Sequence, residues 1–127
     1  GIRDIHGSRI HNSRREDSWG GESFGPGDVI GLCISMPTKK TGHDDKGEIR
    51  FFKNGQPMGQ VIVSRGIRSG GAAFSGVSPG TYYPAVSCYM GAVVQANFGP
   101  HYVFSPKQLP TGFKLKPVAH LCPSPPE

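Results

Sequence analysis

Ile49–Gly59, with the sequence IRFFKNGQPMG, is the stretch that decides the fold. Short apolar runs flank Asn54-Gly55, and this dipeptide favours a two-residue hairpin turn because both residues accept the positive φ angles of a type I′ turn. Pro57 has no backbone N–H group, so the second strand is expected at a sheet edge, or to lose its pairing there. The stretch therefore predicts a β-hairpin. Three apolar side chains are expected to anchor it to the core and two basic ones to face water: Ile49, Phe51 and Met58, and Arg50 and Lys53.

Three further segments have the composition of β-strands. Asp28–Met36 (DVIGLCISM) is a nearly continuous apolar run bounded by glycine and proline, so it predicts a buried central strand with Val29 inside. Tyr82–Tyr89 (YYPAVSCY) and Ala92–Phe98 (AVVQANF) predict two more strands. The short connection between these last two predicts that they form an antiparallel pair.

The connecting segments are expected to be loops. Ser13–Gly27 is polar and rich in glycine, and Trp19 and Phe24 are expected to pin this exposed loop to the core. The segment 64–79 is rich in glycine and serine and predicts a long loop, and Met90-Gly91 predicts a tight turn. Val103 and Phe104 are expected to pack down from the C-terminal segment.

The composition fits one all-β domain. The chain has 127 residues with 19 glycines and 12 prolines, and the glycines lie between apolar runs, where the turns of an all-β protein belong. No segment of useful length has helical periodicity. Residues 1–118 are expected to form the domain, and residues 119–127, which finish in PSPPE, a proline-rich tail or linker.

The cysteine pattern and the hydropathy of the chain indicate a cellular compartment. Cys33, Cys88 and Cys122 stand far apart and are odd in number, which argues for a reducing compartment rather than a disulfide framework. The first two fall in apolar runs and are expected to be small core residues. No signal peptide and no apolar run long enough to cross a bilayer is visible, so the sequence predicts an intracellular protein of the cytosol or nucleus.

The chain is basic, with a formal net charge of +5. From residue 49 onward a single acidic residue, Glu127, stands against seven basic ones: Arg50, Lys53, Arg65, Arg68, Lys107, Lys114 and Lys116. A basic surface suits an acidic peptide, a phosphorylated segment or nucleic acid. Scattered solvated lysines and arginines would give the same count.

No catalytic or metal-binding constellation stands out. His6 and His11 have no cysteine or carboxylate beside them at the spacing of a metal site, and Cys33 and His43 fall on different elements. The glycines lack the strand–loop–helix setting of a phosphate cradle, and no serine or cysteine has the pattern of an activated nucleophile. The sequence therefore predicts a binding protein rather than an enzyme, with no cofactor and no metal.

Four motifs occur in one order along the chain: GDVIG (27–31), IRFFKNG (49–55), YYPAVS (82–87) and ANFG (96–99). The series resembles the SPRY domain, an antiparallel β-sandwich that serves as a protein-interaction module. Within that family the chain is most similar to the Ash-two-like subunit of COMPASS/MLL-type histone H3 lysine-4 methyltransferase complexes. That similarity lies in GDVIG running on to ISMP, in GTYYPAVS, in NFGP followed by PKQL, and in the opening segment 3–11.

The resemblance implies a nuclear, non-catalytic scaffold that supports assembly and stimulation of a SET-domain methyltransferase. It would dock an acidic or phosphorylated segment of the retinoblastoma-binding-protein-five-like subunit. The family's pocket arginine matches Arg3, whose guanidinium would clamp a carboxylate or phosphate in a bidentate way, and Arg9 is a second candidate contact. A family lysine matches Ile5, so part of the pocket departs from the pattern.

The resemblance also departs from the family in extent. The N-terminal strands of a SPRY sandwich are missing from the sequence, so the chain is expected to be the C-terminal part of the domain and to pair with that missing part. Binding of the Dumpy-thirty subunit is not expected, because the chain ends before the helix that would carry it. Two other functions stay open: a SPRY adaptor of a ubiquitin ligase or signalling scaffold, and a basic nucleic-acid-binding domain.

Overall fold

The computed structural model describes residues 1–36, 46–63, 66–69, 71–107, 109 and 114–121. Within these ranges the chain forms strands β1 to β8 and one short 3-10 helix, η1 (Val118–His120), and no α-helix. All the strand pairs are antiparallel. No helix among the described residues has the length and apolar character needed to span a membrane.

The central sheet is built around β4 (Gly47–Lys53). One edge of β4 pairs with β3 (Ile30–Ser35), and the other edge is shared by β5 (Gln56–Pro57) and β8 (Phe74–Val77). The predicted hairpin is confirmed, since the turn between β4 and β5 has φ angles of 51° at Asn54 and 83° at Gly55. The second strand, β5, lies at a sheet edge, as its proline predicts, and the Met58 N–H after Pro57 still donates to the Phe51 carbonyl at 2.9 Å.

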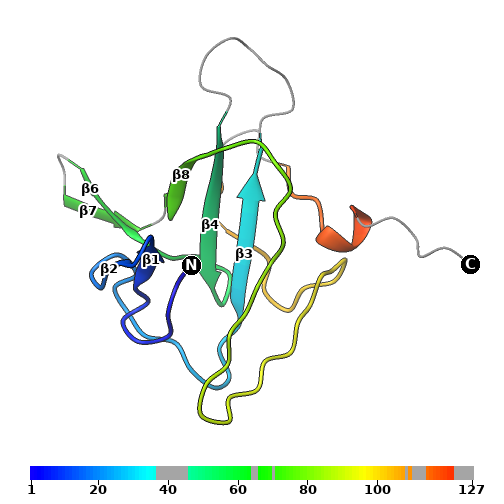
Figure 1. The fold of residues 1–127 in the computed structure, drawn as a ribbon, viewed down its shortest axis with the longest axis horizontal. Coiled ribbons are helices and arrows are strands. Elements are labelled where there is room, and N and C mark those ends of the chain that lie inside the picture. The colour runs from blue at the N-terminus through cyan, green and yellow to red at the C-terminus, as the bar shows by residue number, and fades with distance from the viewer. Residues whose placement is uncertain (37–45, 64–65, 70, 108, 110–113, 122–127) are drawn as a thin grey trace, which may run out of the picture.

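Two small hairpins flank this sheet on the side of β8 (Figure 1). One consists of β1 (Arg9–His11) and β2 (Arg14–Glu16), and the other of β6 (Gln60–Val63) and β7 (Gly66–Ser69). The prediction that residues 13–27 and 64–79 are only loops is therefore wrong. The turn of the first hairpin is Asn12-Ser13, with φ angles of 50° and 63°. Both angles are positive, as they are in the Asn54-Gly55 turn. Because Ser13 stands where a glycine is usual, the sequence did not reveal this turn.

A compact core covers one face of β4. Trp19, Phe51, Met58 and Ala73 are buried there, and the ring of Trp19 meets the ring of Phe51 edge to face at a centroid distance of 6.4 Å. Phe24 packs against this cluster. The predictions that two aromatic residues pin the segment 13–27 to the core, and that the hairpin contributes the core anchors, are confirmed.

The two basic residues of β4 do not face water. Only 15% of the Arg50 side chain is exposed, and its Nη2 lies 2.7 Å from a carboxylate oxygen of Glu48. Lys53 donates from Nζ to the carbonyl of Ser23 at 2.9 Å. Solvent exposure was predicted for both residues, but long side chains can lay their aliphatic stems along the sheet and carry the charge to a partner.

The strand predicted for residues 28–36 is confirmed as β3, but it is not a central strand. Among the described strands β3 pairs with β4 alone, so its other edge carries no ladder. Val29 lies before the strand and is 40% exposed, while Leu32 and Ile34 are half exposed. The continuous apolar sequence predicted a strand that is buried on both faces. In the structure the side chains of β3 are only partly buried.

The strands predicted for residues 82–89 and 92–98 are absent. Both segments are extended, and no ladder joins them to each other or to another described strand. The turn between them is confirmed, with φ angles of 53° at Met90 and 77° at Gly91 and a bond from the Ala92 N–H to the Tyr89 carbonyl at 3.2 Å. Strand-forming sequence sets an extended backbone, but a strand also needs a neighbour to pair with.

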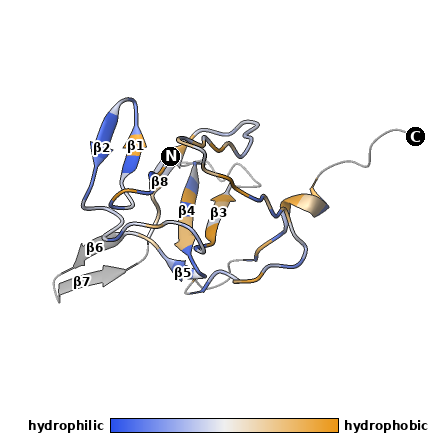
Figure 2. Cartoon of the chain, turned by 90° about the horizontal axis from the view of Figure 1, so that it is seen from below, coloured by the Kyte–Doolittle hydropathy of each residue, from blue (hydrophilic) through white to orange (hydrophobic). Residues whose placement is uncertain are grey.

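Residues 78–98 are exposed throughout, whereas β4, whose hydrophobic residues are orange in Figure 2, has no exposed residue. The prediction of core burial is therefore wrong for Cys88, which is exposed, while Cys33 on β3 is half-buried. Val103 is 80% exposed, so its predicted packing is wrong as well. The predicted tail begins within η1, and its part 122–127 lies outside the described residues.

Candidate functional site

The β1–β2 hairpin presents two faces of different chemistry. Its register pairs Arg9 with Glu16, Ile10 with Arg15 and His11 with Arg14. Side chains alternate across a strand, so the pairs at both ends share one face and the middle pair lies on the other. Each face borders its own hollow.

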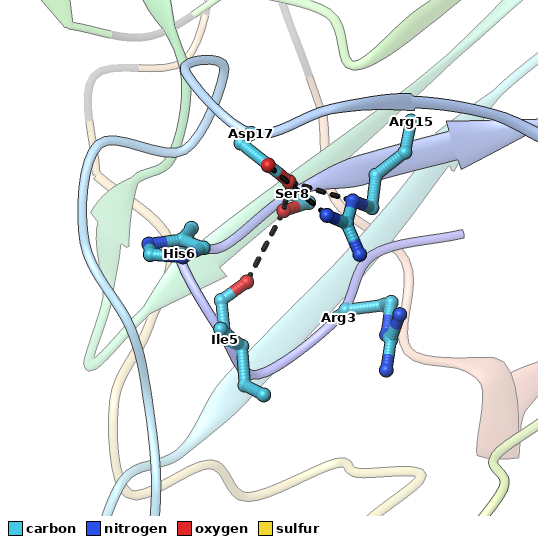
Figure 3. A pocket seen from close by; sticks show the side chains of 6 residues that line it. All are labelled: Arg3, Ile5, His6, Ser8, Arg15 and Asp17. Carbon is cyan, nitrogen blue, oxygen red and sulfur yellow. Dashed lines mark hydrogen bonds and ion pairs between the residues drawn. The ribbon is translucent and has the colours of Figure 1, made fainter.

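The first hollow, of about 70 Å³, contains the predicted residue Arg3 (Figure 3). A turn at His6-Gly7, where both residues have positive φ, folds the N-terminal segment back on itself. The backbone N–H of Arg3 donates to the Ser8 carbonyl at 2.9 Å. Six residues line the hollow: Arg3, Ile5, His6, Ser8, Arg15 and Asp17.

Asp17 is the fixed negative charge of this hollow. It accepts the hydroxyl hydrogen of Ser8 at 2.6 Å and faces the Arg15 guanidinium at 2.9 Å. The bond from Ser8, and then the positive charge of Arg15, lower the pKa of the Asp17 carboxyl. Asp17 is therefore ionised at neutral pH and neutralises Arg15.

Arg3 is the cation of this hollow that remains without a partner. Among the described residues, no hydrogen bond or ion pair engages its guanidinium, and Figure 3 shows its side chain apart from the linked group of Ser8, Arg15 and Asp17. Ile5, which the resemblance places at a lysine position, has an exposed side chain. The hollow thus offers one uncompensated guanidinium, which suits a single carboxylate or phosphate.

Arg9, the second predicted residue, lies on the opposite face of the hairpin. Its Nη1 donates to the Ala73 carbonyl at 2.8 Å, and its Nε pairs with the carboxylate of Glu16. This pairing lowers the pKa of the Glu16 carboxyl. Arg9 fastens the hairpin to the chain before β8, and the structure does not bring it together with Arg3.

Sequence reasoning missed Ser8, Arg15 and Asp17 as members of the hollow. Arg14-Arg15 followed by Glu16-Asp17 appeared as an exposed charged loop. Recognition of Asn12-Ser13 as a hairpin turn would have sorted these four charges onto two faces by their alternation.

His6 and His11 lie in different surroundings. His6 lines the first hollow, whereas the His11 ring lies 5.8 Å from that of Phe74, at an interplanar angle of 61°. In the part of the chain that the structure describes, no group of at least three His, Cys, Asp or Glu side chains is placed to hold a metal ion.

A family model of the SPRY domain matches residues 2–101. The chain belongs to the SPRY domain family. Its fold class is therefore the all-β, antiparallel sandwich class predicted from the sequence motifs, and the antiparallel strands described above agree with it.

This SPRY domain is similar to curated proteins of at least two kinds. It is similar to "Set1 complex component ash2" of Schizosaccharomyces pombe, with 28% identity over 175 residues that cover 94% of this chain and 26% of the relative. It is also similar to the Drosophila melanogaster "Set1/Ash2 histone methyltransferase complex subunit ASH2", with 39% identity over 56 residues, 44% of this chain and 8% of that protein.

The second kind is represented by "E3 ubiquitin-protein ligase RKP" of Arabidopsis thaliana, with 33% identity over 105 residues, 78% of this chain and 7% of the relative. The chain thus spans about a quarter or less of the length of the curated relatives it matches. No solved structure matches it.

Proposed function

We propose that this SPRY domain is a non-catalytic scaffold that docks an acidic or phosphorylated segment of a partner. The proposal places it in the nucleus, in a Set1-type complex that methylates lysine 4 of histone H3, where it supports assembly and stimulation of the SET-domain enzyme. Similarity to two Ash2 subunits supports the complex. The unpartnered guanidinium of Arg3, in a hollow whose other charges neutralise each other, supports the docking chemistry.

Arg3 is the residue on which the docking proposal depends. Two parallel N–H groups of one guanidinium match the two oxygens of a carboxylate or phosphate. The hollow of about 70 Å³ is sized for one such group. The proposed acidic partner is a subunit of the retinoblastoma-binding-protein-five-like type.

Arg9 has a lesser part in this proposal. Two of its N–H groups are engaged by Glu16 and by the Ala73 carbonyl, and arginine carries five donors. The remaining donors could contact a partner that passes over the hairpin, but not the group held by Arg3.

The test is calorimetric titration of the full chain with three peptides that differ at one position, which is phosphoserine, glutamate or serine. Arg3→Ala should weaken binding of the first two by about 1.5–3 kcal/mol, the range for a hydrogen bond to a charged group. Arg3→Lys should restore only part of the affinity because lysine lacks the bidentate geometry. Lys116→Ala, a change of another exposed basic residue, is the control.

Unchanged affinity in Arg3→Ala, or equal binding of all three peptides, would remove Arg3 from the site. A binding strength that depends on salt and not on the phosphoserine would instead favour a nucleic-acid-binding domain.

A SPRY adaptor of a ubiquitin ligase is the second candidate function, because the Arabidopsis relative is named as a ubiquitin-protein ligase and aligns with 78% of this chain. Such an adaptor would bind a short linear motif through loops and would tolerate Arg3→Ala. Affinity capture from nuclear extract with the wild type and with Arg3→Ala separates the two. Methyltransferase subunits lost with the variant support the first function, and ubiquitin-ligase components retained with it support the second.

We also infer that further strands of the same domain cover the free edge of β3 and the extended segment 78–98. The inference is supported by the half-exposed side chains of β3 and by the unpaired, exposed character of that segment. The chain alone should then bind a hydrophobic dye at these exposed apolar surfaces. Absence of dye binding by the chain alone would contradict this inference.

A further inference from the structure

A second hollow, of about 280 Å³, lies on the other face of the β1–β2 hairpin. Its walls are the hairpin residues Arg9, His11, Arg14 and Glu16, and its opposite side is Ala73 and the first residues of β8, Phe74 and Ser75. We propose that this hollow binds an extended peptide in which a carboxylate meets Arg14 and a neighbouring apolar side chain lies against Phe74. This site stands whether or not Arg3 binds a partner.

The size of the hollow favours peptide side chains over a cofactor. Pockets that bury drug-sized ligands and cofactors enclose about 300–1,000 Å³. The volume of about 280 Å³ falls below that range and is enough for one or two side chains. Phe74, half-buried, supplies an apolar surface, and the ring of His11 stands edge-on beside it at 5.8 Å.

The walls of this hollow are held in place before any ligand arrives. Arg9 donates to the Ala73 carbonyl at 2.8 Å and pairs with Glu16, so the hairpin is tied to the chain entering β8. Ala73 is buried and donates its N–H to the Ile49 carbonyl at 2.7 Å. A preformed site loses little conformational freedom on binding, which favours affinity.

The charge of the hollow selects an anionic ligand. Glu16 is neutralised by Arg9, whereas no described residue pairs with the exposed side chain of Arg14. One positive charge, that of Arg14, is therefore left over. A carboxylate is the peptide group that complements it.

The backbone next to the hollow favours an extended ligand. β8 pairs with β4 on one edge, and among the described strands none pairs with its other edge. Ser75 and Gly76 of β8 are exposed. Free N–H and C=O groups on a strand edge can receive a peptide as an added strand, and a side-chain pocket beside them gives specificity.

The experiment titrates the full chain with a peptide that carries Glu-Leu-Glu in a glycine-serine background, and with its Gln-Leu-Gln counterpart. The Glu peptide should bind, and the Gln peptide should bind at least ten-fold more weakly. Arg14→Ala should weaken binding of the Glu peptide by about ten-fold, since it removes a hydrogen bond to a charged group. Arg14→Lys should retain most of the affinity, and Lys116→Ala should retain all of it.

Arg3→Ala separates this site from the one proposed above. Binding of the Glu peptide that persists in Arg3→Ala and falls in Arg14→Ala supports the second hollow. Binding that falls in Arg3→Ala and persists in Arg14→Ala overturns the second hollow and favours the first. Equal binding of the Glu and Gln peptides, or no binding of either, also overturns the proposal without relying on any variant.

Discussion

The segment before residue 78 and the segment 78–98 both contain strand-forming residues, but only the first forms a core. In the first, Trp19, Phe51 and Met58 are buried in a shared core. In the second, Tyr83 and Val93 are 83% and 93% exposed, although this segment is as rich in aromatic and β-branched residues. The comparison teaches that strand-forming sequence creates a core only where a paired neighbour holds it.

The difference has a structural origin in the pairing of β4. β4 has ladder partners on both edges, so the side chains on its core face are enclosed by β3, by β8 and by the segment that carries Trp19. The segment 78–98 has no ladder among the described strands. Its backbone is extended but its side chains have nothing to enclose them.

Two matched alanine substitutions, one in each segment, should give the largest difference in the free energy of unfolding. Phe51→Ala should lower the free energy of unfolding by about 3–5 kcal/mol, because it leaves a cavity beside Trp19 and Met58. Tyr83→Ala should change it by less than about 0.5 kcal/mol, since the ring is exposed. Denaturant titration of both variants measures the two effects. A cost for Tyr83→Ala close to that of Phe51→Ala would mean that the second segment is covered.

Two glycines test how tightly the first segment is packed. Gly59 has a φ of 102°, and a Cβ there would lie 2.8 Å from the ring of Trp19. Gly59→Ala should therefore destabilise the fold by about 2–4 kcal/mol, from crowding and backbone strain together. Gly25 is the control, because a Cβ there meets nothing within 4 Å. Thermal melts that fall equally for both alanine variants would contradict the packing around Trp19.

Acid should weaken the hydrogen bonds that Asp28 accepts just before β3. Asp28 accepts hydrogen bonds from the Gly25 N–H at 2.9 Å and from Asn54 Nδ2 at 3.0 Å, and these bonds lower the pKa of its carboxyl. A carboxyl whose pKa is lower in the folded state stabilises the fold above its unfolded pKa, and that contribution is lost as the pH falls through the folded pKa. Stability should thus decline below about pH 4.

Asp28→Asn is the variant that isolates this effect. It should be less stable than the wild type at neutral pH, and the gap between the two melting temperatures should close as the pH falls below about 4. A gap that stays constant over this range would show that the Asp28 charge does not contribute.

The alkylation rates of Cys33 and Cys88 should show the smallest of the expected differences between the two segments. Burial raises the pKa of the Cys33 thiol, partly offset by the positive charge of Arg50. Cys88 is exposed. An alkylating reagent consumes the thiolate, so Cys88 should react faster than Cys33 near neutral pH when each is followed by mass spectrometry of its peptide. Slower reaction of Cys88 would indicate that the second segment is shielded.

The candidate site was only partly predictable. Arg3 could be named from a motif resemblance, and the structure does leave its guanidinium without a partner among the described residues. Arg9 could be named too, but its contact with Ala73 crosses 64 positions of sequence. No local pattern records such a contact, because the two groups meet only when the hairpin docks beside β8.

The sequence by itself determined the local geometry. Asn54-Gly55 specified a turn with two positive φ angles, Pro57 specified that the second strand lies at a sheet edge, and Met90-Gly91 specified another turn. These features depend on the backbone preferences of neighbouring residues, which a sequence states directly. The SPRY motifs predicted the fold class by their resemblance to a known family, and the family model confirms it.

Only the tertiary structure decided which apolar and charged residues are enclosed. Arg50 is largely buried against Glu48 and Val29 is exposed, the reverse of what alternation and continuous hydrophobicity predict. The same holds for the two faces of the β1–β2 hairpin, whose hollows exist because other segments lie against them. Burial depends on contacts between distant parts of the chain, and a residue's own type constrains those contacts only weakly.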